Sequence, residues 1–253
     1  MHILICFALK EEAAPFRNIA AGRAGLTILL TCIGRVNAER ALRDYLTGGA
    51  GASTGRFQET PSCKTRLAST IAPPDLVLTC GFAGGLNPDL KVGDVAFEIP
   101  SRSSRRELAQ TRFDEMSEPT DVGDCDLEKK LTFAGAKAAK FFCADRIATT
   151  IAEKKSLRDQ TGADAVEMES AAIQAVCAEG GIPCITVRVI SDSADDDLPL
   201  DFNALTRPDR NLDYGKLFLA IAKSPGKIGA LMKLQKQTRF AAKRLAEVLA
   251  RVV

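Results

Sequence analysis

Three carboxylates of the sequence follow apolar runs, at places where a buried strand would open into a loop or a helix. Glu12 comes after the first apolar run of the chain, Glu169 lies in the segment AVEMESAA, and Asp192 follows the run Cys184–Ile190. The sequence contains a single histidine, His2, at the start of the first run. A Ser-His-Asp or Cys-His site needs an imidazole beside its nucleophile, so we expect proton transfer in this chain to use carboxylates.

Each of these carboxylates also has a purely structural interpretation. Acidic residues favour the first turn of a helix, which would account for Glu12 and for the pair Glu167 and Glu169. Asp192, with Ser191 before it, could equally cap a helix or form an Asx turn. If the AVEMES segment is extended, however, Glu167 and Glu169 share one face of it. Carboxylates that are partly buried on such a face need partners, and ligand hydroxyls are suitable ones.

A glycine-rich segment, Gly81–Leu86 (GFAGGL), follows the apolar run Asp75–Cys80. Its three glycines allow the backbone to turn tightly and to approach a ligand closely, because no Cβ stands in the way. The segment matches neither the dinucleotide motif GxGxxG nor the phosphate-binding P-loop, which ends in a lysine. On its own, the segment predicts a structural turn more strongly than a binding loop.

The composition excludes several other classes of protein. No apolar run reaches the roughly 20 residues of a membrane-spanning helix, and the N-terminus lacks the basic start and long apolar core of a secretory signal. The eight cysteines are scattered singly, without a CxxC pair. We therefore expect reduced thiols in a cytoplasmic protein, and neither a metal nor another cofactor.

The net charge of +2 is unevenly distributed along the chain. Residues 223–253 carry eight basic side chains and one acidic one, which gives this tail a charge of +7 and leaves −5 for residues 1–222. The apolar residues of the tail keep helical spacing, which predicts a basic amphipathic helix over about 226–252. Since the chain has no tryptophan and does not interleave basic with aromatic residues, we expect no binding of nucleic acid.

Apolar, strand-like runs alternate with helical segments along most of the chain. We expect strands over residues 2–9, 26–33, 75–80, 92–99, 140–144 and 184–190, and helices over residues 36–46, 127–139, 151–160, 168–179 and about 226–252. This alternation predicts one α/β domain over residues 1–253, with a mostly parallel or mixed sheet covered on both faces. Residues 47–72, rich in Gly, Ser and Thr, are expected to be a flexible insertion. Ligands of such folds gather at the carboxyl ends of the strands, where the three carboxylates lie.

Four segments of the chain occur together in an order that is specific to one family. They are ALKEE, TCIGRVNAERAL, DLVLTCGFAGGLNPDLKVGDV and AVEMESAAIQAVCAEGGIPCITVRVISDSAD. In these segments, over roughly residues 1–46 and 75–205, the chain resembles the nucleoside phosphorylase superfamily and above all its branch of methylthioadenosine/S-adenosylhomocysteine nucleosidases. The resemblance implies a three-layer α/β/α fold with a central mixed, mostly parallel sheet. It also implies cleavage of the N-ribosidic bond of a purine-type nucleoside.

The resemblance further implies roles for the residues that match the family's motifs. Asp192 would be the general acid at the purine leaving group, Glu12 would orient and activate the attacking water, and Glu169 would bind the ribose hydroxyls. Glycosidic cleavage passes through an oxocarbenium-like state, which suits acid assistance at the base and negative charge near the sugar. Other expected contacts are Met168, Val166, Gly81, Phe82, Ala83, Gly84 and Ile147 around the substrate, with Ser191 and Arg188 supporting Asp192.

The sequence leaves both water and phosphate open as the attacking group. Phosphorylases of this superfamily carry an arginine-containing loop after the first strand, where this chain has Lys10 followed by Glu11 and Glu12. A carboxylate there repels a phosphate dianion and can polarise water, which favours hydrolysis slightly. Phosphate could still be held by Lys10, Arg35 or Arg40. The alternatives are therefore a phosphorylase acting on a nucleoside or a lipid-linked nucleoside, and a non-catalytic nucleoside-binding homologue.

Three features depart from the usual nucleosidase pattern. Phe82 stands where the nucleosidases usually have a small polar residue, and Ile147 replaces an aromatic residue that commonly stacks on the base. The basic tail is longer than usual and resembles that of hopanoid-associated relatives, whose substrate is a nucleoside on a lipid. We expect the tail to pack on the domain, or on another subunit of a homo-oligomer, more readily than on a membrane.

Overall fold

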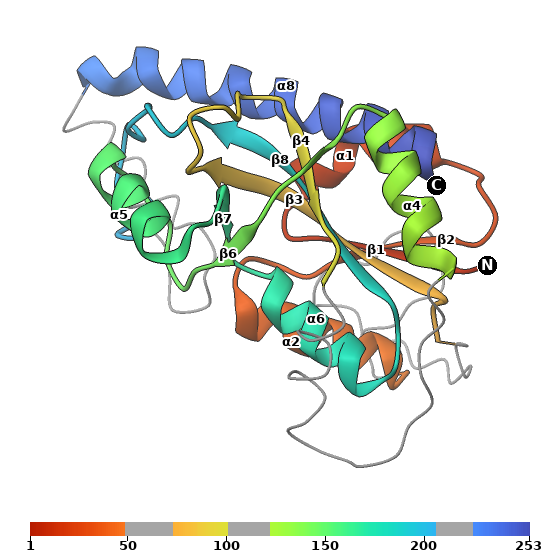
Figure 1. Ribbon diagram of the computed structural model, residues 1–253. Helices are drawn as coiled ribbons and strands as arrows, with labels where there is room; N and C mark the ends of the chain where they lie inside the picture. Colours follow the sequence, from red (N-terminus) through yellow and green to blue (C-terminus); the bar gives the residue numbers. More distant parts are fainter. Residues whose placement is uncertain (49–72, 101–121, 206–224) are drawn as a thin grey trace.

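The computed structural model describes residues 1–48, 73–100, 122–205 and 225–253, and its centre is a mixed sheet (Figure 1). The main path of the sheet follows the order β2 (Leu26–Leu30), β1 (Ile3–Phe7), β3 (Leu76–Gly85), β8 (Cys184–Asp192), β4 (Val95–Glu98) and β5 (Lys137–Ala138). Off this path, β7 (Ala165–Glu167) pairs with β3 and with β6 (Phe141–Cys143). β2, β1, β3 and β8 are parallel, whereas β4 is antiparallel to β8 and β7 is antiparallel to β3. The predicted mixed, mostly parallel sheet is confirmed.

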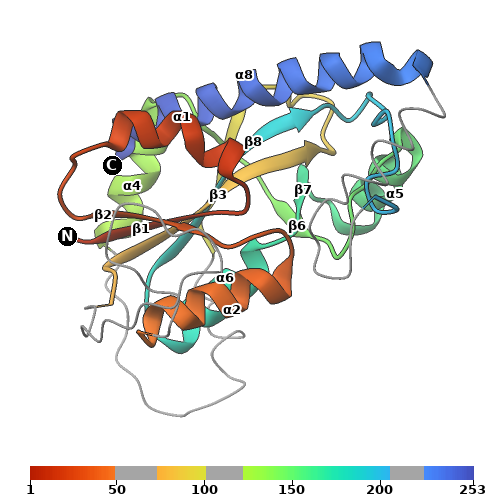
Figure 2. The same ribbon diagram turned by 180° about the vertical axis from the view of Figure 1, so that it is seen from behind.

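Helices cover both faces of this sheet, so the predicted three-layer arrangement is also confirmed (Figures 1 and 2). One face carries α1 (Lys10–Ala20), α4 (Val122–Phe133) and α8 (Ile228–Val252), and the other carries α2 (Arg35–Leu46) and α6 (Ser170–Glu179). Helix α5 (Ile151–Thr161) lies beside β6 and β7, beyond the carboxyl ends of β3 and β8. A short 3-10 turn, η1 (Pro225–Lys227), leads into α8.

The alternation of side chains along the strands fills two cores. From β1, Ile5 and Phe7 pack into the core under α1 and α8, whereas Leu4 and Cys6 pack into the core under α2 and α6. Every residue of β8 is buried, as expected for a central strand that is covered on both faces. A charged residue in this strand, such as Arg188, must therefore find its partners inside the protein.

Helix α8 has an exposed N-terminal half and a buried C-terminal half. Met232 and Phe240 are 66% and 51% exposed, whereas Ala241, Leu245 and Leu249 are buried against the core under α1. The expectation that the tail packs on the domain is thus confirmed for its C-terminal half. Among the described residues, no helix is both long and apolar enough to cross a membrane.

The glycine-rich segment GFAGGL is not the turn that the sequence predicts. β3 continues through it to Gly85, with an irregularity in register between Ala83 and Gly84. The segment stays extended because β8 pairs with β3 as far as Gly84 and because β7 pairs with Gly84 and Gly85. Hydrogen bonds from two neighbouring strands outweigh the conformational freedom of the glycines.

Two helix boundaries also differ from the prediction. The helix predicted over residues 127–139 ends at Phe133, and residues 137–138 belong to β5. Gly135, with φ of +94°, turns the chain out of the helix in the way that glycine commonly does. Helix α6 begins at Ser170, so Met168 and Glu169 precede it. Most of the predicted insertion, residues 49–72, lies outside the described residues.

Candidate active site

A buried arginine, Arg188 of β8, lies at the centre of the candidate site, with only 1% of its surface exposed. Its Nη2 is 2.5 Å from Oε2 of Glu167 and 3.2 Å from Oγ1 of Thr79. Its Nη1 is 3.3 Å from Oε2 of Glu169. Burial of an unpaired guanidinium would be very unfavourable, so the two glutamates compensate its charge. Arg188 thereby fixes the junction between β7 and α6 against the central strand.

Glu12 approaches Arg188 from the first turn of α1. Its carboxylate accepts hydrogen bonds from the backbone N–H of Leu9 and of Phe82, each with an N–O distance of 2.8 Å. Burial raises the pKa of Glu12 to about 7, although the N–H of Phe82, the charge of Arg188 and the N–H of Leu9 oppose the rise. A carboxyl group with this pKa can accept and release a proton near neutral pH, as a general base must.

Gly81 of β3 allows Glu12 and Arg188 to converge. A Cβ added at Gly81 would lie 2.8 Å from Nη1 of Arg188 and 2.8 Å from Oε1 of Glu12, and the φ angle there is +152°. Both the space and the backbone conformation therefore require glycine. The sequence predicts that these glycines permit a close approach, and in the structure the groups that approach Gly81 are side chains of the protein itself.

Glu169 connects this cluster to α2. Its Oε1 accepts a hydrogen bond of 2.9 Å from the N–H of Gly34, which precedes α2, while its Oε2 faces Arg188. Burial raises the pKa of the Glu169 carboxyl, and the nearby Glu167 adds to the rise against the opposing charge of Arg188. Glu169 is held in place by these contacts at the carboxyl end of the sheet.

Glu167, which the sequence places on one face with Glu169, has a different environment. Its carboxylate accepts hydrogen bonds from the N–H groups of Glu169 and Ser170, at 2.9 and 2.8 Å, and from the Ser170 hydroxyl at 2.5 Å. Although burial opposes ionisation, Arg188 and these donors hold the pKa of Glu167 below its ordinary value. Glu167 is therefore the ionised partner of Arg188. The sequence signal for it was an arginine within an apolar strand, which must have such a partner.

Asp192 lies on β8 four residues beyond Arg188, which places the two α-carbons roughly 13 Å apart along the strand. Its Oδ2 is 2.6 Å from Nζ of Lys154, and its Oδ1 is 2.6 Å from Oγ of Ser191. Gly84 and Val166 form the wall beside it, since a Cβ added at Gly84 would lie 3.3 Å from both Asp192 Oδ2 and Val166 Cγ1. Sequence reasoning missed Lys154 because a lysine in the polar segment IAEKKSLRDQT has the pattern of an exposed residue.

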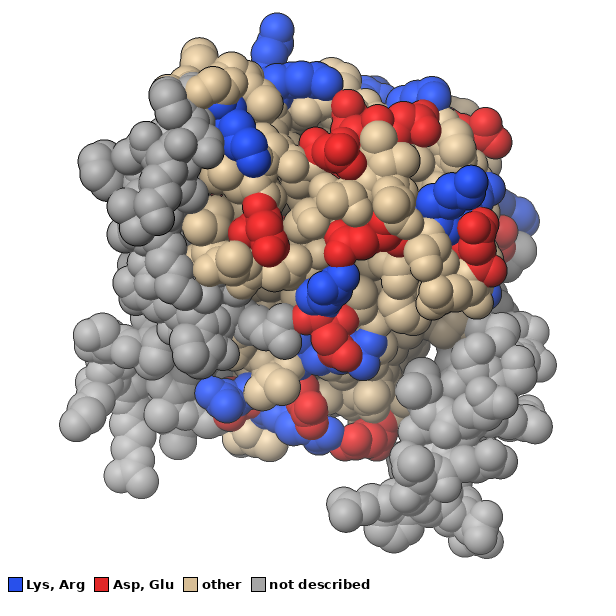
Figure 3. Space-filling model, turned by 90° about the vertical axis from the view of Figure 1, so that its left-hand side faces the viewer, with Lys and Arg blue, Asp and Glu red and all other residues tan. Residues whose placement is uncertain are grey.

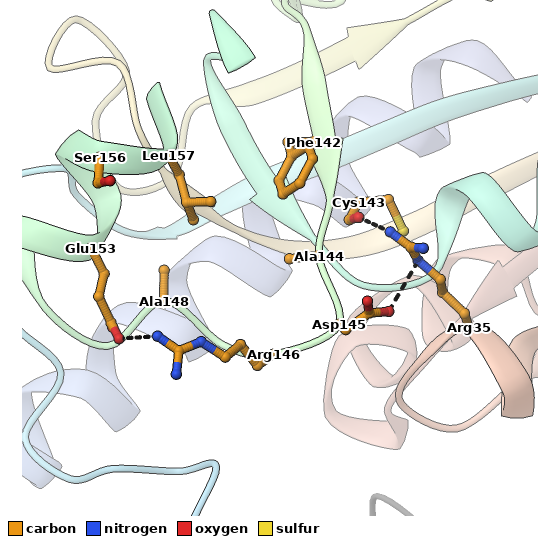
Figure 4. A pocket seen from close by; sticks show the side chains of 10 residues that line it. All are labelled: Arg35, Phe142, Cys143, Ala144, Asp145, Arg146, Ala148, Glu153, Ser156 and Leu157. Carbon is orange, nitrogen blue, oxygen red and sulfur yellow. Dashed lines mark hydrogen bonds and ion pairs between the residues drawn. The ribbon is translucent and has the colours of Figure 1, made fainter. Parts of the chain in front are cut away.

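A cavity of about 380 Å³ lies beside this row of residues, between β6 and α5 (Figure 4). At one end Arg35 donates to the backbone carbonyl of Cys143 and lies 3.5 Å from the carboxylate of Asp145. At the other end Arg146 pairs with Glu153. The residues that line the cavity are Arg35, Phe142, Cys143, Ala144, Asp145, Arg146, Ala148, Glu153, Ser156 and Leu157.

None of the three predicted carboxylates is among the residues described as lining this cavity. The cavity is nevertheless adjacent to the site through two elements. Cys143 of β6 pairs with Glu167 of β7, and Glu153, in the cavity wall, precedes Lys154 in α5. The cavity therefore borders both the Arg188 cluster and the Asp192 end of the site.

The other residues predicted to contact the substrate lie at different distances from the carboxylates of the site. Ala83 is close to the Asp192 end, because its carbonyl oxygen is 3.3 Å from Oγ of Ser191. The Phe82 side chain packs against the core under α1 and α8. The backbone N–H and C=O of Ile147 are both hydrogen-bonded to the Asn203 carboxamide, at 2.9 Å each. Met168 is half-buried beside Glu169, between β7 and α6. Arg40 is exposed on α2, and it lies neither in the cavity wall nor among the described contacts of the carboxylates.

The face of the molecule on the α5 side mixes acidic and basic side chains (Figure 3). In its described part the two kinds are interspersed, rather than forming the continuous basic stripe that is typical of nucleic-acid-binding surfaces.

Known proteins that are similar to this chain carry the names of nucleosidases. The chain is similar to the 5′-methylthioadenosine/S-adenosylhomocysteine nucleosidase of Haemophilus influenzae (strain PittEE), with 25% identity over 215 residues, covering 80% of this chain and 90% of the relative. The corresponding enzyme of Shewanella piezotolerans is 30% identical over 164 residues, or 59% of this chain and 70% of that protein.

Solved structures share the fold over nearly the whole chain. The Helicobacter pylori 5′-methylthioadenosine/S-adenosylhomocysteine nucleosidase superposes with a TM-score of 0.59 at 19% identity, covering 100% of this chain and 97% of the other. The futalosine hydrolase of the same species gives a TM-score of 0.56 at 19% identity, covering 98% and 97%. A family model of the phosphorylase superfamily matches residues 15–221. The chain therefore belongs to the phosphorylase superfamily.

Proposed function

We propose that this protein is an N-ribosyl hydrolase that cleaves the bond between ribose and the base of a purine-type nucleoside. The proposal is based on the row of buried acidic residues at the carboxyl ends of the strands. The carboxylates of Glu12 and Glu169 lie beside Arg188. The α-carbon of Asp192 lies roughly 13 Å from that of Arg188 along β8. The names of the relatives, nucleosidases and a futalosine hydrolase, support the same reaction class.

In this proposal the sugar occupies the Arg188 end of the row and the base occupies the Asp192 end. Carboxylates beside the sugar stabilise the positive charge that develops on the ring as the glycosidic bond breaks. Glu169 accepts hydrogen bonds from ribose hydroxyls, and Glu12 takes the proton of the attacking water. Asp192 gives a proton to the departing base, and Val166 and Gly84 form the wall against which the base lies.

Water is favoured over phosphate as the attacking group because of how Glu12 is held. The N–H groups of Leu9 and Phe82 are suitable donors for an anion, but both already donate to the Glu12 carboxylate. A phosphate dianion would have to displace Glu12 or lie against it, which like charges oppose. Arg35, a phosphate candidate in the cavity wall, is engaged with Cys143 and Asp145. Phosphorolysis is thus the weaker alternative.

The proposal also covers the domain organisation, the oligomeric state and the cellular location of the protein. We propose one domain over residues 1–253, assembled into a homo-oligomer, in the cytoplasm. Six of the cysteines among the described residues carry free thiols, which supports a reducing compartment. The exposed, basic N-terminal half of α8 is the candidate for contact with another subunit, and contact with an anionic membrane is the alternative for the same surface.

A panel of nucleosides tests the proposed reaction class. Purine and pyrimidine nucleosides, including 5′-methylthioadenosine and adenosine, would be incubated with the protein, and the released base measured by chromatography. We expect release of purine bases and little release of pyrimidines. Failure to release base from every member of the panel would favour the non-catalytic nucleoside-binding homologue.

A further inference from the structure

Lys154 of α5 is fully buried, and its ammonium group is completely engaged at the Asp192 end of the site. Its Nζ lies 2.6 Å from Oδ2 of Asp192, 2.7 Å from the carbonyl oxygen of Ser193 and 2.8 Å from the carbonyl oxygen of Asp196. An ammonium group has three N–H donors, so each donor has one acceptor. This arrangement orients the ammonium rigidly toward one oxygen of the Asp192 carboxylate.

The other carboxylate oxygen, Oδ1, faces a hydroxyl that can act in two ways. Oγ of Ser191 is 2.6 Å from Oδ1 and 3.3 Å from the carbonyl oxygen of Ala83. When Asp192 is ionised, the Ser191 hydroxyl donates to Oδ1. When Oδ1 carries a proton, that proton can be donated to Oγ of Ser191, and the hydroxyl hydrogen can turn to Ala83. The site therefore accommodates a proton on Oδ1, whereas the ammonium group disfavours one on Oδ2.

Other groups around Asp192 leave Lys154 as its main electrostatic partner among the described residues. Gly84 of β3 and Val166 of β7 are uncharged. Asp196, whose backbone oxygen also contacts Lys154, has a carboxylate that interacts with the Ser193 hydroxyl at 3.0 Å and with Lys233 of α8 at 3.3 Å. Lys233 is exposed and pairs with Asp196. The buried Lys154 therefore determines the electrostatic environment of the Asp192 carboxylate.

We propose that Lys154 is a positioning residue that confines the exchangeable proton of Asp192 to Oδ1 and stabilises the carboxylate left when that proton is transferred. The inference rests on the proposed function. As the bond between ribose C1′ and the base nitrogen breaks, its electron pair passes to the base, and the Oδ1 proton passes to a ring nitrogen of the base. Asp192 becomes a carboxylate whose new charge faces the Lys154 ammonium. The Ser191 hydroxyl then turns from Ala83 to donate to Oδ1.

The test compares Lys154→Met with Lys155→Met, a control in which the neighbouring lysine is exposed on the same helix. Base release would be measured as kcat/KM over pH 5 to 10, beside the thermal midpoint of each variant. Without the ammonium, the charge that proton transfer leaves on Asp192 has no counter-charge facing it. We therefore expect kcat of Lys154→Met for the purine nucleoside to fall by at least about 10-fold. Lys155→Met should retain the wild-type profile.

Two further measurements separate positioning from simple structural support. A 4-nitrophenyl riboside has a leaving group that needs no proton, so Lys154→Met should lose less activity on it than on the purine nucleoside. Ser191→Ala, which keeps the buried ion pair, provides a variant in case Lys154→Met does not fold. It removes the hydroxyl that donates to Oδ1, so its kcat should also fall more on the purine nucleoside than on the 4-nitrophenyl riboside. Equal losses on the two substrates in either variant would overturn the inference. A wild-type protein without base release would instead refute the proposed function, and the inference with it.

Discussion

The carboxylate of Glu12 lies 2.8 Å from the backbone nitrogen of Phe82, and this hydrogen bond joins the first turn of α1 to the glycine-rich part of β3. The bond holds a buried acidic side chain next to Gly81 and Arg188, in the row that ends at Asp192. A helix start and an irregular strand end, far apart in the sequence, thus build the part of the site that we assign to the attacking water.

The raised pKa of Glu12 predicts a pH dependence of catalysis. Since Glu12 acts as a base only when ionised, kcat/KM for base release should rise with pH on the acidic side of the profile, through about pH 7. Glu12→Gln should lower kcat by about 10²- to 10⁴-fold, because the amide cannot accept the proton of water. Glu11→Gln, at an exposed neighbouring position, is the matched control and should keep the wild-type rate. A Glu12→Gln variant with near-normal kcat would remove Glu12 from this role.

The same pKa predicts how Glu12 affects folding. Its folded-state pKa of about 7 is above the ordinary value of 4.5, so the folded protein binds more protons than the unfolded chain between these pH values. Its contribution to stability is therefore fully present below about pH 4.5 and is lost as the pH rises through about 7. Denaturant titrations should show Glu12→Gln gaining stability relative to the wild type from pH 4.5 to 8. A constant difference over this range would contradict the assignment of a raised pKa.

Gly81→Ala should damage both the site and the fold. The added methyl group would meet Glu12 and Arg188 at 2.8 Å, so these side chains must move apart. We expect a loss of about 1 to 3 kcal/mol in the free energy of unfolding, as for other overpacked positions, together with a large loss of kcat. Gly229→Ala in α8 is the control, because an added Cβ has no neighbour within 4 Å there and alanine favours a helix. Chemical denaturation and base-release assays would measure the two effects, and a Gly81→Ala variant as active as Gly229→Ala would contradict the packing.

How much of this could be predicted from the sequence depends on whether the signal was local. The strand β8, the helices α2, α5 and α6, and the mixed sheet follow from apolar runs and their periodicity. The glycine-rich end of β3 did not follow, because only the pairing with β7 and β8, from distant parts of the chain, keeps it extended. Lys154 could not be found either, since its burial depends on the approach of α5 to the end of β8.

The acidic residues of the site also show which features local sequence signals could not predict. Asp192, Glu169 and Glu12 were singled out from their positions after apolar runs, and the resemblance to a family added their roles. The difference between Glu167 and Glu169 was invisible, because it arises from one contact with Arg188 and from the N–H groups at the start of α6. Two glutamates separated by one residue thus have opposite pKa shifts.

Asp192→Asn should abolish proton donation to the base while leaving the fold intact. Asparagine keeps the shape of the side chain but carries no transferable acid proton, so kcat for base release should fall by at least about 10²-fold. Asp195→Asn, three residues further along at an exposed position, provides the control and should remain active. Circular dichroism would establish that both variants are folded. Retention of more than about a tenth of the wild-type rate by Asp192→Asn would exclude Asp192 as the acid.

The most direct test of the account is the identity of the sugar product in phosphate-free buffer. The wild-type protein would be mixed with a purine nucleoside that it accepts, with and without inorganic phosphate, and the base and sugar products would be quantified by mass spectrometry. The account predicts equal amounts of free base and free sugar at the same rate in both buffers. A reaction that stops without phosphate and yields ribose 1-phosphate when phosphate is present would contradict it.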